Sequence, residues 1–346
     1  MILNEIKTHK QNTTIHKTYK LTKKQTKTTK LKIGCHISIM PSILDGIYYG
    51  ESIGANALQL FMGSKLSFSL KQKTKLTTDE CKTIKNYVSR NKLTLFIHSP
   101  YVLNFCSYSA SSGRIQYQHA NIQYDLNYGS LIGAKCVVLH IGFKKNLSNE
   151  EALHNLVSNI IQIAKTMPKN ITLGLETSAC RGSEFGCTLE ELKLIWDGIH
   201  NHKYNKTRKH SKTSKHSKTS KPNKNIKNVG FVIDTAHIFV SGYDISTVSG
   251  IKHYLDTFDK MIGLKHILGF HINDSRYSVG EKKDEHRGLG KGKLYTTPEG
   301  LKALKYIKSL CIKKTIPMIL ETHSAGSPEK TESKDYDYEI DLIKKM

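Results

Sequence analysis

The pattern of hydrophobic positions along the chain repeats eight times. Short apolar runs rich in β-favouring residues alternate with longer amphipathic stretches, and successive runs mostly end 25 to 50 residues apart. The runs end near His36, Phe61, His98, His140, Glu176, Asp234, His271 and Glu321. Eight such β-α units predict an α/β protein with the TIM (β/α)8 barrel fold. A doubly wound open sheet is the alternative, but no G-x-G-x-x-G sequence follows the first strand.

Helix-start signals lie between the runs, where the amphipathic stretches begin. Three capping boxes are present, with Ser or Thr followed three residues later by Glu. They are the pairs Thr77 and Glu80, Ser148 and Glu151, and Thr188 and Glu191. Pro298 follows Thr297, as is typical of a first helical residue. These signals predict helices in the stretches that a barrel requires.

Two polar, basic segments interrupt this pattern and hold most of the formal net charge of +24. Residues 1–30 carry eight lysines and one glutamate, and residues 203–228 carry nine lysines, one arginine and no acid. The second segment repeats the hexamer HSKTSK at 210–215 and 216–221. Both are too poor in apolar residues to offset the entropy of ordering. We therefore expect a basic, disordered extension over 1–30, one barrel domain over 31–346, and a low-complexity insertion over 199–228.

The basic segments suggest loose, salt-sensitive contact with nucleic acid, because clustered lysines attract phosphates. A targeting signal in residues 1–30 and neutral drift of the insertion are the alternatives. The histidines of the repeated hexamer could bind a metal ion, although a solvated low-complexity segment is the simpler interpretation.

Composition also limits the compartment. No stretch reaches the roughly 18 consecutive apolar residues of a membrane span, and the first residues lack the apolar core of a secretory signal. Seven cysteines, an odd number with no C-x-x-C pair, argue against a disulfide framework. We expect an intracellular protein in a reducing compartment, with no membrane partner and with nucleus and cytoplasm both open.

Candidate catalytic or metal-binding side chains lie at the ends of the predicted strands, because seven of the eight runs stop at His, Glu or Asp. In a barrel these ends meet at one mouth, where active sites form. One histidine there is commonly structural, but seven converging ionisable groups would leave buried charges unpaired. A cluster of divalent zinc or manganese removes that penalty. The spacings Asp234-x-x-His237 and Asp284-x-His286 suggest a second part of the same site.

With these motifs assembled, the sequence resembles the endonuclease IV family of zinc-dependent apurinic/apyrimidinic (AP) endonucleases. The likeness runs from about residue 32 to 324 in the family's order. It rests on GCHIS at 34–38, HSPYVLN at 98–104, VLHIG at 138–142, LET at 175–177, GS at 182–183, FVIDTAHIFVSGYD at 231–244, HINDSR at 271–276, DEHRGLG at 284–290 and ILET at 319–322. The resemblance independently implies a TIM barrel.

The resemblance further implies three zinc ions per chain, with manganese as an alternative at one site. By motif match, His98, His140 and Glu176 would hold the first ion. Glu176 would bridge to the second, which Asp234, His271 and Glu321 complete, and His237, Asp284 and His286 would hold the third. Tyr101 and Val102 match a loop with which the family penetrates DNA. The family is also typically monomeric.

The resemblance also implies the reaction, which is hydrolysis of the phosphodiester 5′ of an abasic site in duplex DNA, leaving a 3′-OH and a 5′-deoxyribose phosphate. Trimming of blocked 3′ ends is expected as well. An extruded abasic nucleotide loses little stacking, and a zinc-activated hydroxide would attack in line. Glu176 and Glu321 are the expected catalytic residues, with Glu321 orienting or deprotonating the nucleophile.

Two rival functions use the same fold. A xylose-isomerase-like sugar isomerase or epimerase needs about four ligands for one or two metals, which would leave His237, Asp284 and His286 unused. A non-catalytic DNA-binding barrel with structural zinc would not need an open coordination site. His36 could support a metal ligand or be a structural histidine, and both readings stay open.

Overall fold

The computed structural model describes residues 30–67, 69–200, 226–322 and 336–346. The predicted N-terminal extension, apart from Lys30, lies outside the described residues, and so does most of the predicted insertion, at 201–225. Helix α6 ends at His200 and strand β6 begins at Val229, on either side of this undescribed segment.

Eight parallel strands close into a barrel in the order in which they follow one another along the chain. They are β1 (Ile33–His36), β2 (Ala57–Phe61), β3 (Thr94–His98), β4 (Cys136–His140), β5 (Thr172–Glu176), β6 (Val229–Asp234), β7 (Ile267–His271) and β10 (Met318–Leu320). Strand β10 pairs with β1 and completes the ring. The predicted TIM barrel is confirmed, and the open doubly wound sheet is wrong.

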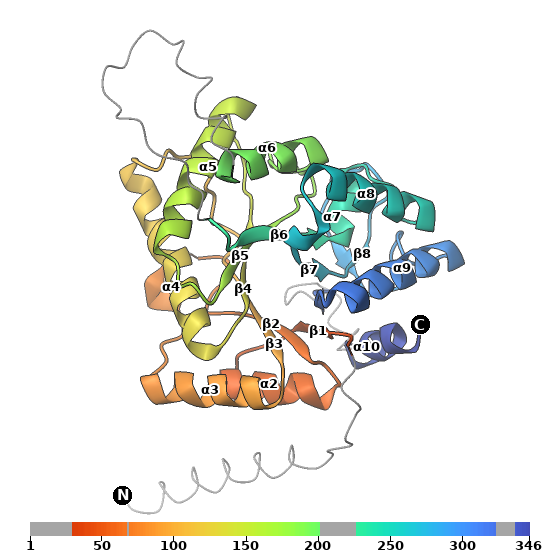
Figure 1. The fold of residues 1–346 in the computed structure, drawn as a ribbon, viewed down its shortest axis with the longest axis horizontal. Helices are drawn as coiled ribbons and strands as arrows, with labels where there is room; N and C mark the ends of the chain where they lie inside the picture. The colour runs from red at the N-terminus through yellow and green to blue at the C-terminus, as the bar shows by residue number, and fades with distance from the viewer. Residues whose placement is uncertain (1–29, 68, 201–225, 323–335) are drawn as a thin grey trace, which may run out of the picture.

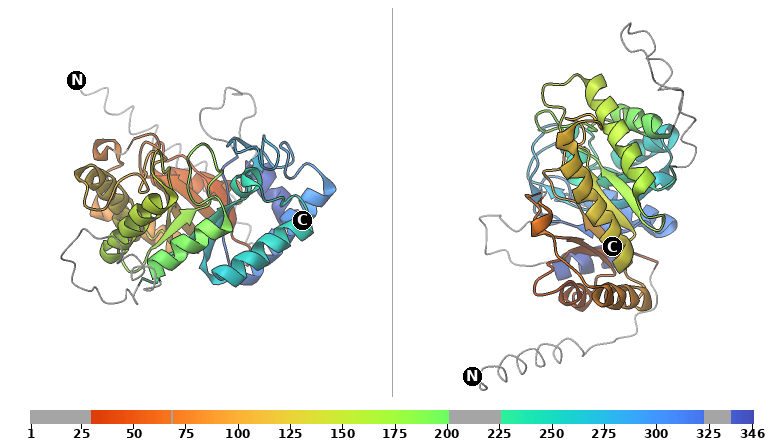
Figure 2. Two further views of the ribbon diagram at one scale, coloured as in Figure 1. Left: turned by 90° about the horizontal axis from the view of Figure 1, so that it is seen from above. Right: turned by 90° about the vertical axis from the view of Figure 1, so that its left-hand side faces the viewer.

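Helices surround the barrel on its outside, as Figure 1 and the two further views in Figure 2 show. They are α2 (Ile43–Ser52), α3 (Thr78–Arg90), α4 (Gln116–Ile132), α5 (Asn149–Thr166), α6 (Leu189–His200), α7 (Thr235–Ser241), α8 (Val248–Met261), α9 (Pro298–Lys314) and α10 (Tyr336–Lys345). Short 3-10 turns lie at Leu70–Gln72, Gly113–Ile115 and Leu264–His266. Each barrel strand is thus followed by at least one helix.

The predicted helix starts are confirmed with one difference. The pairs Thr77 with Glu80 and Ser148 with Glu151 form reciprocal capping boxes, and Pro298 opens α9. Thr188 accepts a hydrogen bond from the Glu191 amide, as a cap should. The Glu191 carboxylate, however, accepts from the amides of Gly186 and Cys187, so it stabilises the preceding loop instead of closing a box.

Two apolar layers hold the barrel. A small inner cluster that includes Phe96, Val138 and Val232 fills the inside, and a larger layer lies between strands and helices. Gly269 makes room for Phe96, because a Cβ at this glycine would lie 2.9 Å from the phenylalanine ring. The barrel is therefore a packed core, and polar side chains can gather only at its ends.

A short two-stranded arm stands beyond the C-terminal end of β7. Its strands are β8 (Asp274–Ser275) and β9 (His286–Arg287), which pair in antiparallel fashion. The buried Asp274 carboxylate accepts hydrogen bonds from five backbone amides, those of Ser275, Gly290, Gly292, Leu294 and Tyr295. Asp274 thus ties the chain after β9 to the end of β7.

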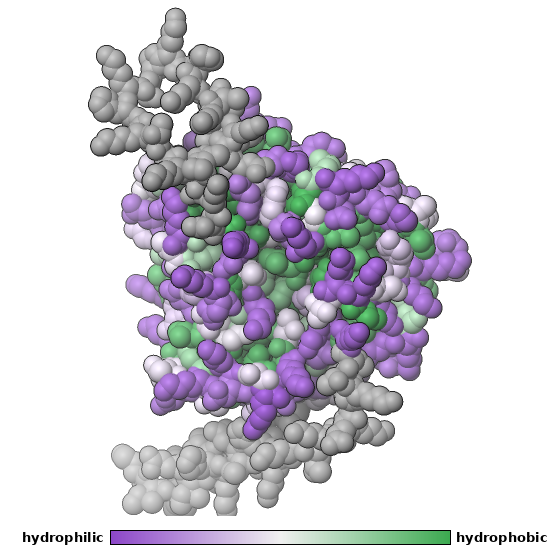
Figure 3. All heavy atoms as spheres, viewed as in Figure 1, coloured by the Kyte–Doolittle hydropathy of each residue, from purple (hydrophilic) through white to green (hydrophobic). Residues whose placement is uncertain are grey.

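On the face shown in Figure 3, hydrophilic side chains predominate among the described residues, and apolar areas lie between them. None of the described helices combines the length and the apolar character needed to cross a membrane. The seven cysteines are free thiols, as the sequence predicts.

Candidate metal centre

The predicted strand ends converge as expected. His98, His140, Glu176, Asp234 and His271 are the last residues of their strands, and Glu321 follows β10 directly. Because all eight strands are parallel, these ends lie at one mouth of the barrel. The side chains form three groups, which we call the first, second and third group.

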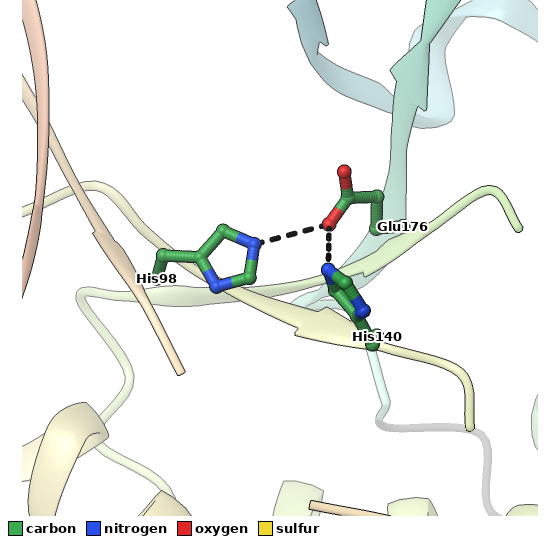
Figure 4. Close-up of side chains that lie close together, drawn as sticks. All are labelled: His98, His140 and Glu176. Atoms are coloured by element: carbon green, nitrogen blue, oxygen red, sulfur yellow. Dashed lines mark hydrogen bonds and ion pairs between the residues drawn. The ribbon is translucent and has the colours of Figure 1, made fainter. Parts of the chain in front are cut away.

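The first group consists of His98, His140 and Glu176, from three neighbouring strands. The Nε2 atoms of both histidines lie 3.1 Å from the same carboxylate oxygen, Oε2 of Glu176. Figure 4 shows the two imidazoles pointing toward this oxygen from different sides. His98 and Glu176 are buried, whereas the His140 side chain keeps 24% of its surface exposed, so one side of the group faces solvent.

The second group consists of Glu176, Asp234, His271 and Glu321, with one ligand atom of each within 4.8 Å of the others. Its centre is Nδ1 of His271. This nitrogen lies 2.7 Å from Glu176 Oε1, 3.1 Å from Glu321 Oε2 and 3.9 Å from Asp234 Oδ2. Glu176 therefore contributes one oxygen to each of the first two groups.

The third group consists of His237, Asp284 and His286. The Nε2 atoms of His237 and His286 both lie 3.3 Å from Asp284 Oδ1. His237 stands on the first turn of α7, where its amide bonds to Asp234, and His286 stands on β9. Asp234 also lies close to both histidines, with its Oδ2 3.7 Å from His286, so this aspartate connects the second and third groups.

Charge is closely balanced across the three groups. Burial lowers the pKa of His271, but Glu321 and Glu176 outweigh it and raise this pKa to about 9. The pKa of His286 is likewise about 9, since Asp234 and Asp284 overcome burial. Burial opposes ionisation of Glu176, yet His271 and His140 hold its pKa well below the usual range. Protons on the histidines thus compensate the carboxylates wherever no metal ion does.

Hydrogen bonds behind the groups fix which imidazole nitrogen faces inward. His98 donates from Nδ1 to the carbonyl oxygen of Ser99 at 2.7 Å, and His237 donates from Nδ1 to that of Thr177 at 2.8 Å. A carbonyl only accepts, so both rings carry a proton on Nδ1 and turn Nε2 toward their group, where it can bind a metal ion.

The remaining predicted residues lie around the first group. The Tyr101 ring packs against Phe61, His98 and His140, with ring centres 5.0–5.3 Å apart. Val102 is 38% exposed on the adjoining loop. His36 packs against Phe61 at 4.5 Å and contacts Gln59, so it supports the centre from behind and belongs to none of the three groups.

Two buried amides of the centre are absent from the sequence prediction. Asn273 donates from Nδ2 to Asp234 Oδ2 at 2.6 Å and accepts from the Glu321 amide at 2.9 Å. Gln59 contacts both His271 and Glu321. The signal for Gln59 was a single polar residue within the otherwise apolar run Ala-Leu-Gln-Leu-Phe at 57–61.

The donor chemistry of the three groups fits zinc. Each group offers imidazole nitrogens and carboxylate oxygens, the ligands that zinc takes beside thiolate. The Nε2 atoms of His237 and His286 are buried and, although each lies 3.3 Å from Asp284 Oδ1, neither forms a well-directed hydrogen bond with a described residue. Buried polar atoms of this kind are costly unless something binds them. A metal ion in the third group would satisfy both.

Comparison with known proteins agrees with this geometry. A family model described as "Xylose isomerase-like TIM barrel" matches residues 47–205 and 222–346. A protein of Acanthamoeba polyphaga mimivirus that bears the name "Putative endonuclease 4" is 29% identical over 321 residues, 90% of this chain and 92% of its own length. A protein of Shouchella clausii named "Probable endonuclease 4" is 29% identical over 318 residues, covering 91% and 97%.

Solved structures share the barrel. Endonuclease IV from Thermus thermophilus superposes with a TM-score of 0.67 at 21% identity, over 91% of this chain and 98% of that one. A D-tagatose 3-epimerase-like protein superposes with a TM-score of 0.58 at 17% identity, over 91% and 96%.

The relatives named endonuclease 4 match nearly the full length of the chain, and the motifs that carry the resemblance lie at the mouth of the barrel. These findings confirm the resemblance to endonuclease IV and, with it, the prediction that the protein is an enzyme of the nuclease class of hydrolases. The chain belongs to the xylose isomerase-like TIM barrel family.

Proposed function

We propose that this protein is a zinc-dependent AP endonuclease that cuts duplex DNA on the 5′ side of an abasic site. The observation that carries the proposal is the third group. In this group, which lies beside the other two, the Nε2 atoms of His237 and His286 both lie 3.3 Å from Asp284 Oδ1. A sugar isomerase needs only the four side chains of the second group, so this additional group favours the nuclease.

Three zinc ions are the proposed cofactors. His98, His140 and Glu176 would hold the first, Glu176, Asp234, His271 and Glu321 the second, and His237, Asp284 and His286 the third, with Asp234 near enough to assist. When bound, zinc would lower the pKa of a water molecule toward neutrality and offset the negative charge on the phosphodiester oxygens. Manganese could replace zinc at one site.

The protein's own side chains orient this chemistry. Glu176 is buried and places one oxygen in each of the first two groups, which fixes the distance between them. Glu321 is the most exposed carboxylate of the second group, at 10% of its side-chain surface, against 2% for Glu176 and none for Asp234. It is therefore the group best placed to accept a proton from an attacking water molecule.

DNA would reach the centre past the loop after β3. The Tyr101 ring forms a wall beside the two histidines of the first group, and burial raises the pKa of its hydroxyl, which keeps it a neutral donor. The neighbouring Val102 projects to the surface, where an apolar side chain can enter an unstacked step of the duplex. An abasic nucleotide gives up little stacking when it is extruded toward such a wall.

The proposal is tested with a duplex that contains one tetrahydrofuran analogue of an abasic site, with and without a strong chelator. Wild-type protein should cut immediately 5′ of the analogue, and chelator should abolish the cut. Glu321→Gln should lose about a hundredfold or more in rate, as is typical when a catalytic acid–base group is removed. Glu299→Gln, which changes an exposed glutamate on α9, is the matched control and should retain full activity.

The analogue cannot undergo β-elimination, so a lyase would leave it intact. A folded, zinc-loaded protein that leaves the duplex uncut would exclude the proposal and would favour the two alternatives, a sugar isomerase or a non-catalytic DNA-binding barrel. Zinc content would then separate those two, because the isomerase needs one or two metals.

A further inference from the structure

Strand β2 is the one barrel strand with no His, Asp or Glu at its end or directly after it, yet it reaches the candidate metal centre through Gln59. This side chain has no exposed surface. Its Oε1 lies 2.9 Å from His271 Nε2, and its Nε2 lies 2.5 Å from Glu321 Oε1. The same Nε2 lies 3.3 Å from His36 Nδ1 on β1, which pairs with β2. The amide of Gln59 on β2 therefore contacts three side chains that lie at the ends of three other strands, β1, β7 and β10.

The contact with Glu321 determines the orientation of the amide. A carboxylate oxygen only accepts, so the group facing it at 2.5 Å must be the NH2 of Gln59, and the carbonyl must face His271. The carbonyl in turn only accepts, so His271 carries a proton on Nε2. The second N–H of the amide is directed to the lone pair on His36 Nδ1.

These bonds decide which ligand atoms stay available. With Nε2 bound to Gln59, Nδ1 is the His271 nitrogen that can exchange its proton for a metal ion, and it lies 2.7 Å from Glu176 Oε1 and 3.1 Å from Glu321 Oε2. With Oε1 bound to the amide, Glu321 presents Oε2 to the same point. Gln59 thus binds one atom of His271 and one of Glu321 and turns the other atom of each, His271 Nδ1 and Glu321 Oε2, toward the second group.

We propose that Gln59 is a positioning residue of the second metal site, which holds His271 in the Nδ1-coordinating tautomer and aims Glu321 Oε2 at the metal ion. The inference rests on the proposed function of the centre and adds to it a residue that touches no metal itself. Partners of this kind, one step behind the ligands, typically contribute about 10- to 100-fold to metal affinity.

The test replaces the amide by an apolar side chain of similar length, Gln59→Met. Gln118→Met is the matched control, because Gln118 is also a buried glutamine with a backbone hydrogen bond, to Asn104, and lies on α4 away from the three groups. Zinc affinity is measured without DNA, by competition with a chromophoric chelator, and bound zinc is counted by elemental analysis.

We expect Gln59→Met to lower the affinity for one of the bound zinc ions by about 10- to 100-fold. Gln118→Met should lower the melting temperature and leave the affinity for every zinc ion unchanged. Equal zinc affinities in the two variants would overturn the proposal. This readout needs no catalysis. If wild type binds zinc but does not cut DNA, the proposed function fails, whereas the role of Gln59 is judged on affinity alone.

A second measurement uses only wild-type protein and covers the case in which Gln59→Met does not fold. In zinc-loaded protein with 15N-labelled histidine, long-range 1H–15N spectra distinguish a metal-bound nitrogen from a protonated one. The His271 ring, assigned with His271→Gln, should show metal on Nδ1 and a proton on Nε2. Metal on Nε2 would contradict the proposal.

Discussion

Individual residues of the centre are held by shared partners, and Glu176 is the clearest case. Its two oxygens contact three histidines from three different strands. The strand ends and the short Asp/His pairs indicated where ligands gather, and the resemblance to endonuclease IV implied all nine proposed ligands. Neither identified Gln59 or Asn273, since an amide within or just after an apolar run carries no charge signal.

Protons and zinc should compete for the same histidine nitrogens. This competition predicts how the melting temperature of the metal-free protein changes between about pH 7 and 9.5. In metal-free protein the pKa of His271 and of His286 is raised to about 9. A raised pKa stabilises the fold fully below the unfolded value of about 6.5, and this stability is lost as pH rises through about 9. The melting temperature of chelator-treated protein should therefore fall across this window.

The melting temperature of zinc-loaded protein should not fall across this pH window, because metal takes the place of the protons. In the metal-free protein, His286→Gln should make the fall in melting temperature smaller. The carboxyl groups with lowered pKa values, Glu176 and Asp284, titrate at acidic pH and do not affect this window. A metal-free melting temperature that stays flat or rises across this pH window would contradict this charge balance.

At the scale of elements, the strand ends were predicted to within one residue. A run that stops at His, Glu or Asp has a sharp boundary, because a charged residue ends the apolar pattern where the strand reaches the barrel mouth. The arm formed by β8 and β9 was not predicted, since two-residue strands have no measurable period. Likewise, the capping box expected at Thr188 was incomplete, because the tertiary fold places two loop amides nearer to Glu191.

The loop after β2 depends on a buried ion pair. Lys73 Nζ lies 2.6 and 2.7 Å from the two oxygens of Asp125 on α4, and both side chains are buried. The same loop accepts a hydrogen bond from the Tyr101 amide through the Lys65 carbonyl. This pair therefore links the loop to the helix that carries Asp125 and supports the backbone beside the proposed DNA contact.

Lys73→Met should lower the free energy of unfolding by about 3–5 kcal/mol, because it leaves Asp125 buried without a partner. Urea unfolding of the metal-free protein measures this loss. The double variant Lys73→Met/Asp125→Leu removes both charges and should recover most of it. A double variant that is less stable than the single one would show that the pair itself, and not the unpaired carboxylate, sets the stability.

For the whole molecule, the barrel and its mouth followed from the sequence, whereas the contribution of the two basic segments is still a prediction. If the extension predicted over 1–30 and the insertion predicted over 199–228 act as non-specific tethers, deleting residues 1–29 and 201–225 within them should weaken binding of undamaged duplex DNA at low salt. Fewer phosphates would then be neutralised, so affinity should also depend less steeply on salt. Filter binding at several salt concentrations measures both effects. Unchanged affinity and slope would exclude tethering.

The measurement that tests the central claim most directly is a zinc titration of metal-free protein, with incision of the tetrahydrofuran duplex followed at each step. Three groups of ligands meet at one barrel mouth, so zinc binding should saturate at three ions per chain, and incision 5′ of the analogue should reach its maximum as the last ion binds. Saturation at one or two ions, or no incision with all three bound, would contradict the account.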